Sequence, residues 1–292
     1  GYRLRMTGKK HFTRYQFIKK NMASKTKKFF VVNQQGQREP FSFQKVLQSA
    51  KRVGATQRMA QEIAQKIEKE VFEGMKTSAI FEKIKVFLIK EMPSASLKFS
   101  LKDAMRKLGP TGFPFEKFIG KVLEKNGYKV KLNQIVKGKC LEYEIDCLTE
   151  KGGETYLVEC KYRNLASDIV DTQNVAVLYA KFLDITQKRK AKPLLVTNAK
   201  FTTRAIKYAK CVGVELLGWQ YPQNMGLERV IDKDKLYPIT ILPSLNKNLL
   251  FALNQADIVL VSELLKANQN NQLGFIPANQ FNKIISEAQL LE

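Results

Sequence analysis

Histidine is almost missing from this sequence of 292 residues. The single copy is His11, and no histidine follows it. This absence excludes the Ser-His-Asp and Cys-His catalytic arrangements, histidine-based zinc proteases, Cys2His2 fingers and nucleases that bind their metal through histidine. Acid–base or metal chemistry in this chain must therefore rely on carboxylates, lysine or water.

Paired cysteines and long apolar runs are also lacking. The four cysteines are scattered without a CxxC pair, which argues against a disulfide scaffold or a zinc ribbon and is typical of a reducing compartment. We therefore expect a cytoplasmic protein, associated with the nucleoid if it is bacterial. No apolar run approaches the ~20 residues of a membrane helix, so no membrane partner is expected. The cysteines are Cys140, Cys147, Cys160 and Cys211.

Acidic residues are absent from the first 28 positions, which hold ten Lys or Arg. We set residues 1–27 aside as a basic tail, with three interpretations open: a nucleic-acid arm, a targeting segment, or a start upstream of the true one at Met22. The formal net charge of the chain is +23, and a basic surplus remains without the tail. It favours an anionic partner, nucleic acid or nucleotide first, over a solubilising lysine-rich surface.

The length suggests two or three domains at about 150 residues each. After the tail, residues 28–108 read as a short strand followed by helices at the C-terminal side of Ser42, over 56–73, 77–91 and 95–107. The run LGPTGFP then marks a boundary.

Residues 109–220 change to an α/β pattern. Three strand-like runs come first, and helices then alternate with strands, which predicts a mixed sheet with helices on both faces. Residues 221–292 are polar and interrupted by proline, then helical from about 244. The fold class is thus multidomain, α and α/β. The expected α/β elements are a helix at 113–126, strands at 128–136, 141–148 and 155–162, a helix at 169–184, a strand at 193–197, a helix at 202–212 and a strand at 214–217.

Two short acidic segments are the best candidates for chemistry. Side chains alternate along a strand, so Glu159 and Lys161 share one face and Cys160 points to the other. Pairing across the Gly152-Gly153 turn can bring Asp146 beside Glu159, and two close carboxylates suit Mg²⁺. Lys161 would then lie beside a metal-bound water and a phosphate. The alternative is a solvated hairpin face with cross-strand ion pairs.

Glu116 lies on the helix that precedes these strands. Gly120 follows it one turn later on the same helix face. A residue without a side chain there would let this helix end approach the site.

Several runs resemble the restriction-endonuclease-like PD-(D/E)xK nuclease superfamily, in its Mrr-type branch. They are FEKFIGKVLEKNGY, EYEIDCL, YLVECKY and PLLVTNAKFTTRAIKYA, within about 113–218. The resemblance implies that Asp146, Glu159 and the Cys160 backbone carbonyl bind the metal, Mg²⁺ or Mn²⁺. It implies that Lys161 is catalytic and that Glu116 is the helix acid, as a further catalytic residue and metal ligand.

Basic residues near these segments are candidate DNA contacts. Related proteins often carry histidine where this chain has Tyr143 and Arg163, so histidine is dispensable here or activity is reduced. Arg163 can still hold a phosphate. The loop cations Lys188, Arg189 and Lys190 also suit phosphate contacts, although a solvated loop is the ordinary interpretation.

Residues 29–108 carry a second resemblance, to the ATP-cone domain, and the junction from Leu101 to Glu116 is similar to that of a family joining a cone to such a nuclease. It implies ATP or dATP as an effector. Cones usually carry Lys-Arg where this chain has Asn33-Gln34, so a degenerate cone kept for packing or dimerisation is the alternative. The expected nucleotide-binding residues are Val32, Asn33, Gln34, Gly36, Lys45, Lys51 and Arg52.

Residues 237–292 look weakly similar to helix-hairpin-helix DNA-binding units; a plain helical cap or dimer interface is the alternative. Together these features predict a metal-dependent DNA endonuclease that acts as a homodimer, since cutting a duplex needs two sites. A nucleotide-responsive DNA-binding regulator without activity is the first alternative. A structural assembly module, with the cone and the C-terminal segment as oligomer contacts, is the second.

Overall fold

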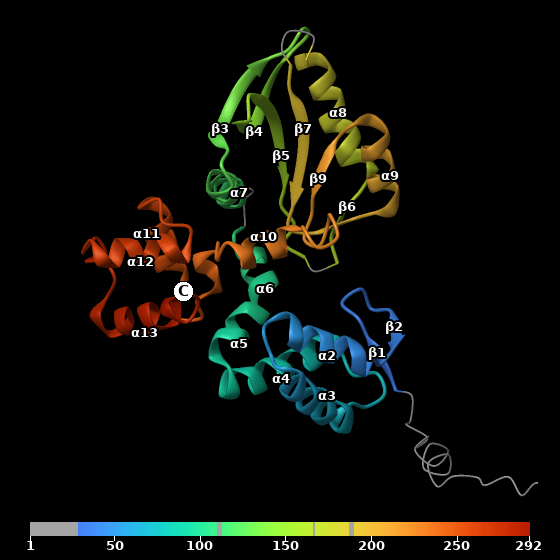
Figure 1. Cartoon of the computed structure of the whole chain (residues 1–292), viewed down its shortest axis with the longest axis vertical. Helices are drawn as coiled ribbons and strands as arrows, with labels where there is room; N and C mark the ends of the chain where they lie inside the picture. The colour runs from blue at the N-terminus through green and yellow to red at the C-terminus, as the bar shows by residue number, and fades with distance from the viewer. Residues whose placement is uncertain (1–28, 110–112, 166, 187–189) are drawn as a thin grey trace, which may run out of the picture.

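The computed structural model describes residues 29–109, 113–165, 167–186 and 190–292. Figure 1 shows an N-terminal helical group in blue and teal, a β-sheet with flanking helices in green to orange, and a C-terminal helical group in red. The basic tail over 1–27 lies outside the described residues, as do Lys188 and Arg189 of the predicted DNA contacts.

The N-terminal group combines a hairpin with three helices around a core of its own. The hairpin strands pair antiparallel, with Val31 opposite Glu39; the second strand was not expected. Ser42 and Thr56 cap the next two helices as predicted, each accepting a backbone N–H three residues on. The elements are β1 (Phe30–Val32), β2 (Arg38–Pro40), α2 (Phe43–Arg52), α3 (Gln57–Glu70) and α4 (Thr77–Glu91).

The predicted single helix over 95–107 is wrong: the chain forms two, α5 (Pro93–Phe99) and α6 (Leu101–Arg106). The Ser100 hydroxyl donates to the Ser96 carbonyl at 3.2 Å, a local bond that competes with regular helix geometry. Buried residues of α6 pack in the same core as the sheet and the C-terminal helices. The helix before the predicted boundary is thus anchored to the segments after it.

The central sheet has the mixed topology that the sequence predicted. Its order is β3-β4-β5-β7-β9; the first three strands pair antiparallel and the last three parallel. A separate small parallel pair, which the sequence did not reveal, consists of β6 and β8. The strands are β3 (Lys129–Lys137), β4 (Glu142–Lys151), β5 (Glu154–Lys161), β6 (Ile169–Val170), β7 (Lys192–Thr197), β8 (Lys200–Phe201) and β9 (Glu215–Leu217).

Helices cover both faces of this sheet (Figure 1). On one face α7 (Phe113–Lys125) buries Phe115 and Phe118 in a core that also holds Cys147, Val158 and Cys160. On the other face lie α8 (Thr172–Thr186) and α9 (Thr203–Val212). The even and odd positions of β5 therefore serve different cores, as strand alternation requires.

The C-terminal segment is helical, and it begins earlier than expected because α10 (Leu227–Lys233) forms in the polar stretch. Its Leu227 and Ile231 are fully buried, and this burial explains the helix. The other elements are a short 3-10 turn (Ile239–Ile241), α11 (Lys247–Gln255), α12 (Val261–Gln269) and α13 (Ala278–Gln289). Within the described ranges, no helix is long and apolar enough to cross a membrane.

The junction between α6 and α7 is attached to the end of β5 through Tyr162. The Tyr162 hydroxyl accepts the Gly109 N–H at 3.1 Å and donates to the Arg106 carbonyl. A Cβ at Gly109 would lie 2.5 Å from that hydroxyl oxygen, so the contact requires glycine. The residue that follows Lys161 thus ties this strand to the N-terminal group.

We predict that Tyr162→Phe lowers the free energy of unfolding by about 1–2 kcal/mol, because it leaves two partly buried backbone groups without a partner. Tyr156→Phe is the matched control, since that hydroxyl donates to the exposed Glu154, and it should cost less than about 0.5 kcal/mol. Urea unfolding measures both; equal losses would contradict the junction contact.

Candidate active site at the end of strands β4 and β5

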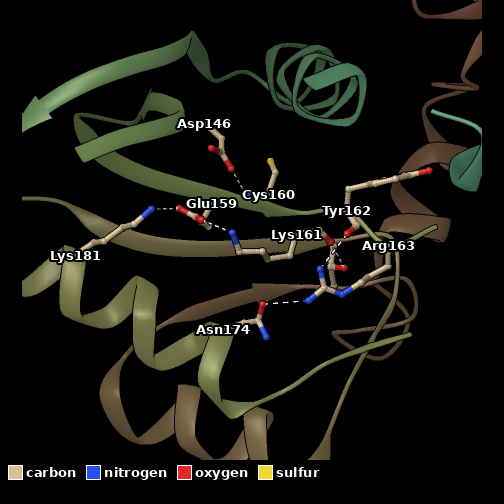
Figure 2. Close-up of polar contacts among 9 residues, drawn as sticks. Asp146, Glu159, Cys160, Lys161, Tyr162, Arg163, Asn174 and Lys181 are labelled. Carbon is tan, nitrogen blue, oxygen red and sulfur yellow. Dashed lines mark hydrogen bonds and ion pairs between the residues drawn. The ribbon is translucent and has the colours of Figure 1, made fainter. Parts of the chain in front are cut away.

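The candidate site begins where the hydrogen-bonded ladder between β4 and β5 stops. The last registered pair is Cys147 opposite Val158. Beyond it the Asp146 carboxylate replaces the next backbone acceptor, and its Oδ2 accepts the Cys160 N–H at 2.6 Å (Figure 2). The two strands separate at this point, and a carboxylate fills the opening.

Burial and negative neighbours act together on Asp146. Desolvation raises the pKa of its carboxyl most, and the charges of Glu159 and Glu116 raise it further, to about 6. The Cys160 N–H and Lys161 lower it. The charges of Asp146 and the other two predicted acids therefore act on one another. Their repulsion and the burial make the ionised form of Asp146 unfavourable unless a cation binds beside it.

Glu159 is a buried carboxylate held by two lysines. Its side chain is 6% exposed; Oε1 lies 2.5 Å from Nζ of Lys161, and Oε2 lies 3.1 Å from Nζ of Lys181. Lys161 follows on the same strand face, as alternation predicted, whereas Lys181 comes from α8 (Figure 2). A carboxylate this buried needs such partners, because an unpaired buried charge is expensive.

Glu116 approaches the site from the first turn of α7. Its Oε2 accepts from Nδ2 of Asn133 at 3.2 Å. Asn133 interrupts the β3–β4 ladder opposite Asp146 and has a φ of 49°, so β3 is distorted there. A Cβ at Gly120 would lie 2.9 Å from Cδ2 of Leu132, so glycine favours the close packing of α7 on β3.

Arg163 lies two residues beyond Lys161 and is fixed by an amide network. Asn198 accepts its N–H at 2.8 Å and donates to its carbonyl at 2.8 Å. Its guanidinium donates to Oδ1 of Asn174 on α8 at 3.2 Å and to the Tyr162 carbonyl (Figure 2). A cation is thus held beside Lys161, while Lys190, the described residue of the predicted loop set, is exposed.

The oxygen donors of this site suit a hard divalent cation. In the described part of the chain, no three His, Cys, Asp or Glu side chains are grouped as a metal cage. Mg²⁺ does not require one, because it is usually bound by one or two carboxylates, with waters and phosphate oxygens completing its shell. Asp146, Glu159 and the Cys160 carbonyl fit that pattern. The raised pKa of Asp146 indicates that a cation bound beside it would stabilise its ionised form. The buried thiols of Cys147 and Cys160 belong to the core.

The predicted nucleotide-binding residues divide between a turn and a cavity. The Asn33 carboxamide oxygen accepts the N–H groups of Gln35 and Gln37, both at 2.9 Å, so Asn33 stabilises the hairpin turn in which Gly36 has a φ of 76°. Lys51 is exposed at the end of α2. Val32, Asn33, Gln34 and Gly36 do not line the cavity described next.

An apolar cavity of about 260 Å³ lies between the hairpin and helices α2 and α4. It is lined by Val31 rather than Val32, and by Lys45, whose Nζ lies 3.1 Å from Oε2 of Glu39. Arg52 lies elsewhere, 3.8 Å from Glu228 on α10. The expected residues therefore do not form one site.

Comparisons with known proteins agree with the nuclease part of this fold. Residues 108–220 match the family described as restriction endonuclease, and residues 237–292 match the family described as AF1548-like, C-terminal. An uncharacterized protein of Archaeoglobus fulgidus is 36% identical over 173 residues, which are 59% of this chain and 98% of that protein. The chain belongs to the family of this archaeal protein.

A solved structure that is similar to this chain is described as the crystal structure of protein of unknown function AF1548. It is 35% identical, with a TM-score of 0.54, and it covers 61% of this chain and 97% of its own. The restriction-endonuclease-like resemblance is thereby confirmed for 108–220, and the C-terminal segment belongs with the AF1548-like group. The cone resemblance stays a prediction, as do the domain boundaries.

Sequence reasoning missed two residues that the fold brings to the site. Asn133 appears in the sequence as one polar residue of an alternating strand, and nothing there indicates its positive φ. Lys181 lies 22 positions after Glu159 on a helix, so only the packing of α8 on the sheet reveals the pair. The available signal was the buried Glu159 itself, which requires positive partners.

We predict that the stability of the metal-free protein falls as pH rises through about 6, because of Asp146. A pKa raised in the folded state means tighter proton binding there than in the unfolded chain. This contribution to folding is therefore complete below the usual pKa of 3.8 and lost above about 6. Asp146→Asn removes it, so the variant should gain stability relative to wild type as the pH rises from about 4 to about 6.

Urea unfolding with EDTA measures this difference. Glu144→Gln is the control, because Glu144 is exposed on the same strand and its replacement should give no pH-dependent gain. A constant difference between Asp146→Asn and wild type over this pH range would contradict the electrostatic description of the site.

Proposed function

We propose that this protein is a metal-dependent endonuclease that hydrolyses DNA phosphodiester bonds. One observation carries the proposal: Asp146, the buried Glu159 and Lys161 meet where the β4–β5 ladder ends. This arrangement lies in a domain that matches the restriction endonuclease family. The high net charge of +23 suits a polyanionic substrate.

Asp146, Glu159 and the Cys160 carbonyl would hold Mg²⁺ or Mn²⁺, with Glu116 beside them. The bound cation supplies Lewis-acid stabilisation of the phosphate and a more acidic water. Lys161 orients the attacking water and offsets charge that develops on the phosphate in the transition state. Lys181 positions Glu159 by holding its second oxygen.

Arg163 contacts the DNA backbone next to the scissile phosphate, since its guanidinium is fixed two residues beyond Lys161. A second contact is proposed for the predicted set Lys188, Arg189 and Lys190. Lys190 is exposed before β7, at the opposite end of that strand from Arg163, so it would meet a different part of the backbone. A homodimer would place two sites on one duplex.

A nucleotide effector is a second element of the proposal. The apolar cavity beside Lys45 can accept a base, and the expected turn at Gly36 belongs to the hairpin that lines one side of this cavity. The turn itself offers no cation at Asn33 and Gln34, so phosphates would need other partners.

We predict that Lys161→Ala lowers the rate of DNA cleavage about 100-fold or more, and that Lys181→Ala lowers it about 10-fold or less. Both substitutions remove one lysine from the same carboxylate, but only Lys161 is assigned to the water and the phosphate. Plasmid cleavage with Mg²⁺ or Mn²⁺ measures the rates, and EDTA should abolish them.

Lys131→Ala is the control for lost charge, because Lys131 is exposed on β3 and should leave the rate unchanged. Equal losses for Lys161→Ala and Lys181→Ala would contradict the assigned role of Lys161. Salt-sensitive DNA binding without cleavage would favour the inactive regulator. Neither binding nor cleavage would favour the assembly module.

A further inference from the structure

A second cavity, of about 300 Å³, lies where the N-terminal helical group meets the sheet domain. Its wall is built from both sides: the C-terminal end of α2, the helices α5 and α6, the strand β8, and the segment that leads into α10. The cations in this wall are Arg52, Lys98, Lys102 and Lys200. None of them belongs to the candidate active site.

The wall of this cavity holds more cations than carboxylates. Glu228 is the one carboxylate in the wall among the described residues, and it lies 3.8 Å from Arg52. Lys98 is paired with Asp232 at 3.3 Å. Lys102 and Lys200 have no carboxylate within 4.0 Å in the described ranges.

The excess of positive charge acts most clearly on Lys102. Burial, together with the charges of Lys200 and Arg106, lowers the pKa of its ammonium group to about 8, although Glu228 acts in the opposite direction. A partly buried lysine beside two other cations destabilises the protein unless an anion compensates it. A phosphate group, with several acceptor oxygens, meets that need for three or four cations at once.

This cationic cavity adjoins the apolar cavity beside Lys45. It shares Ser49, Phe81 and Phe99 with the apolar cavity beside Lys45, so the two adjoin. The rings of Phe81 and Phe99 are stacked, with centroids 4.4 Å apart, and lie between the two. A cationic cavity thus continues into an apolar one along α2.

We propose that this interdomain cavity binds the phosphate groups of a small polyphosphate ligand, through Lys102 and Lys200 with Arg52 and Lys98 at its sides. Such a ligand bridges the two domains, because Arg52 belongs to α2 of the N-terminal group and Lys200 to β8 beside the sheet. Free polyphosphate and a nucleoside triphosphate share this chemistry. A nucleotide differs by placing its base in the adjoining apolar cavity.

Calorimetric titration of the full chain with inorganic tripolyphosphate, in EDTA and without DNA, tests the proposal. The double variant Lys102→Gln/Lys200→Gln should bind about 10-fold more weakly or worse. The double variant Lys69→Gln/Lys131→Gln loses the same charge from exposed sites outside both cavities, and it should bind like wild type. The basic tail is common to all variants and cancels in the comparison.

Glu228→Gln gives a second reading in the opposite direction, which does not depend on the folding of the lysine variant. It removes the carboxylate from the wall and should tighten tripolyphosphate binding several-fold, about 3-fold or more. Unchanged or weaker binding in this variant would overturn the proposal. So would equal binding by the two lysine double variants, or no binding by wild type.

ATP in place of tripolyphosphate separates the two sources. Ile84→Trp fills the apolar cavity. If ATP binds more tightly than tripolyphosphate and this difference is lost in Ile84→Trp, the ligand is a nucleotide. Equal binding of ATP and tripolyphosphate supports free polyphosphate. If the lysine substitutions weaken only duplex DNA binding, the cations belong to a DNA surface and the proposal fails. Lys161→Ala should leave anion binding unchanged, so a failure of the nuclease assignment is distinguishable from a failure here.

Discussion

The candidate site depends on one local event, the replacement of a backbone acceptor by the Asp146 carboxylate. The ladder between β4 and β5 runs regularly from the Gly152-Gly153 turn to Cys147 and Val158, and the next N–H, that of Cys160, is bound by a side chain instead. The strands can then separate without leaving a buried N–H group unpaired. The opening places carboxylate and carbonyl oxygens together at the sheet, with Glu159 and Lys161 on the same strand.

Charge balance is the second constraint. Glu159 is buried with a lysine on each oxygen, whereas Asp146 has negative neighbours and a raised pKa. The site is thus arranged so that one carboxylate is neutralised by the protein and the other would be neutralised by a bound cation. The interdomain cavity shows the opposite imbalance, with Lys102 short of an anion. Each site borders a contact with the N-terminal part of the chain. Tyr162, which follows Lys161, bonds to Gly109 and Arg106, and Lys200 lines the interdomain cavity.

Much of the sheet was predictable because its determinants are local. Alternation fixed the faces of Glu159, Cys160 and Lys161, and the glycine turn fixed the register that places Asp146 directly beyond the last pair, beside the Cys160 N–H. The break at Ser100 was not predictable, because the helical pattern of apolar residues continues through it. The roles of Lys181 and the interdomain cations were not predictable for another reason. Their contacts depend on how α8 and the N-terminal group pack on the sheet, and this packing cannot be inferred from sequence spacing.

The most direct measurement is a crystal structure of the wild-type protein soaked with Mn²⁺, with anomalous diffraction used to locate the ion. We expect an anomalous peak at the end of the β4–β5 ladder, within about 2.5 Å of oxygens from Asp146, Glu159 and the Cys160 carbonyl. A Mn²⁺ ion bound elsewhere, or an empty site at a concentration of Mn²⁺ that supports DNA cleavage, would contradict it.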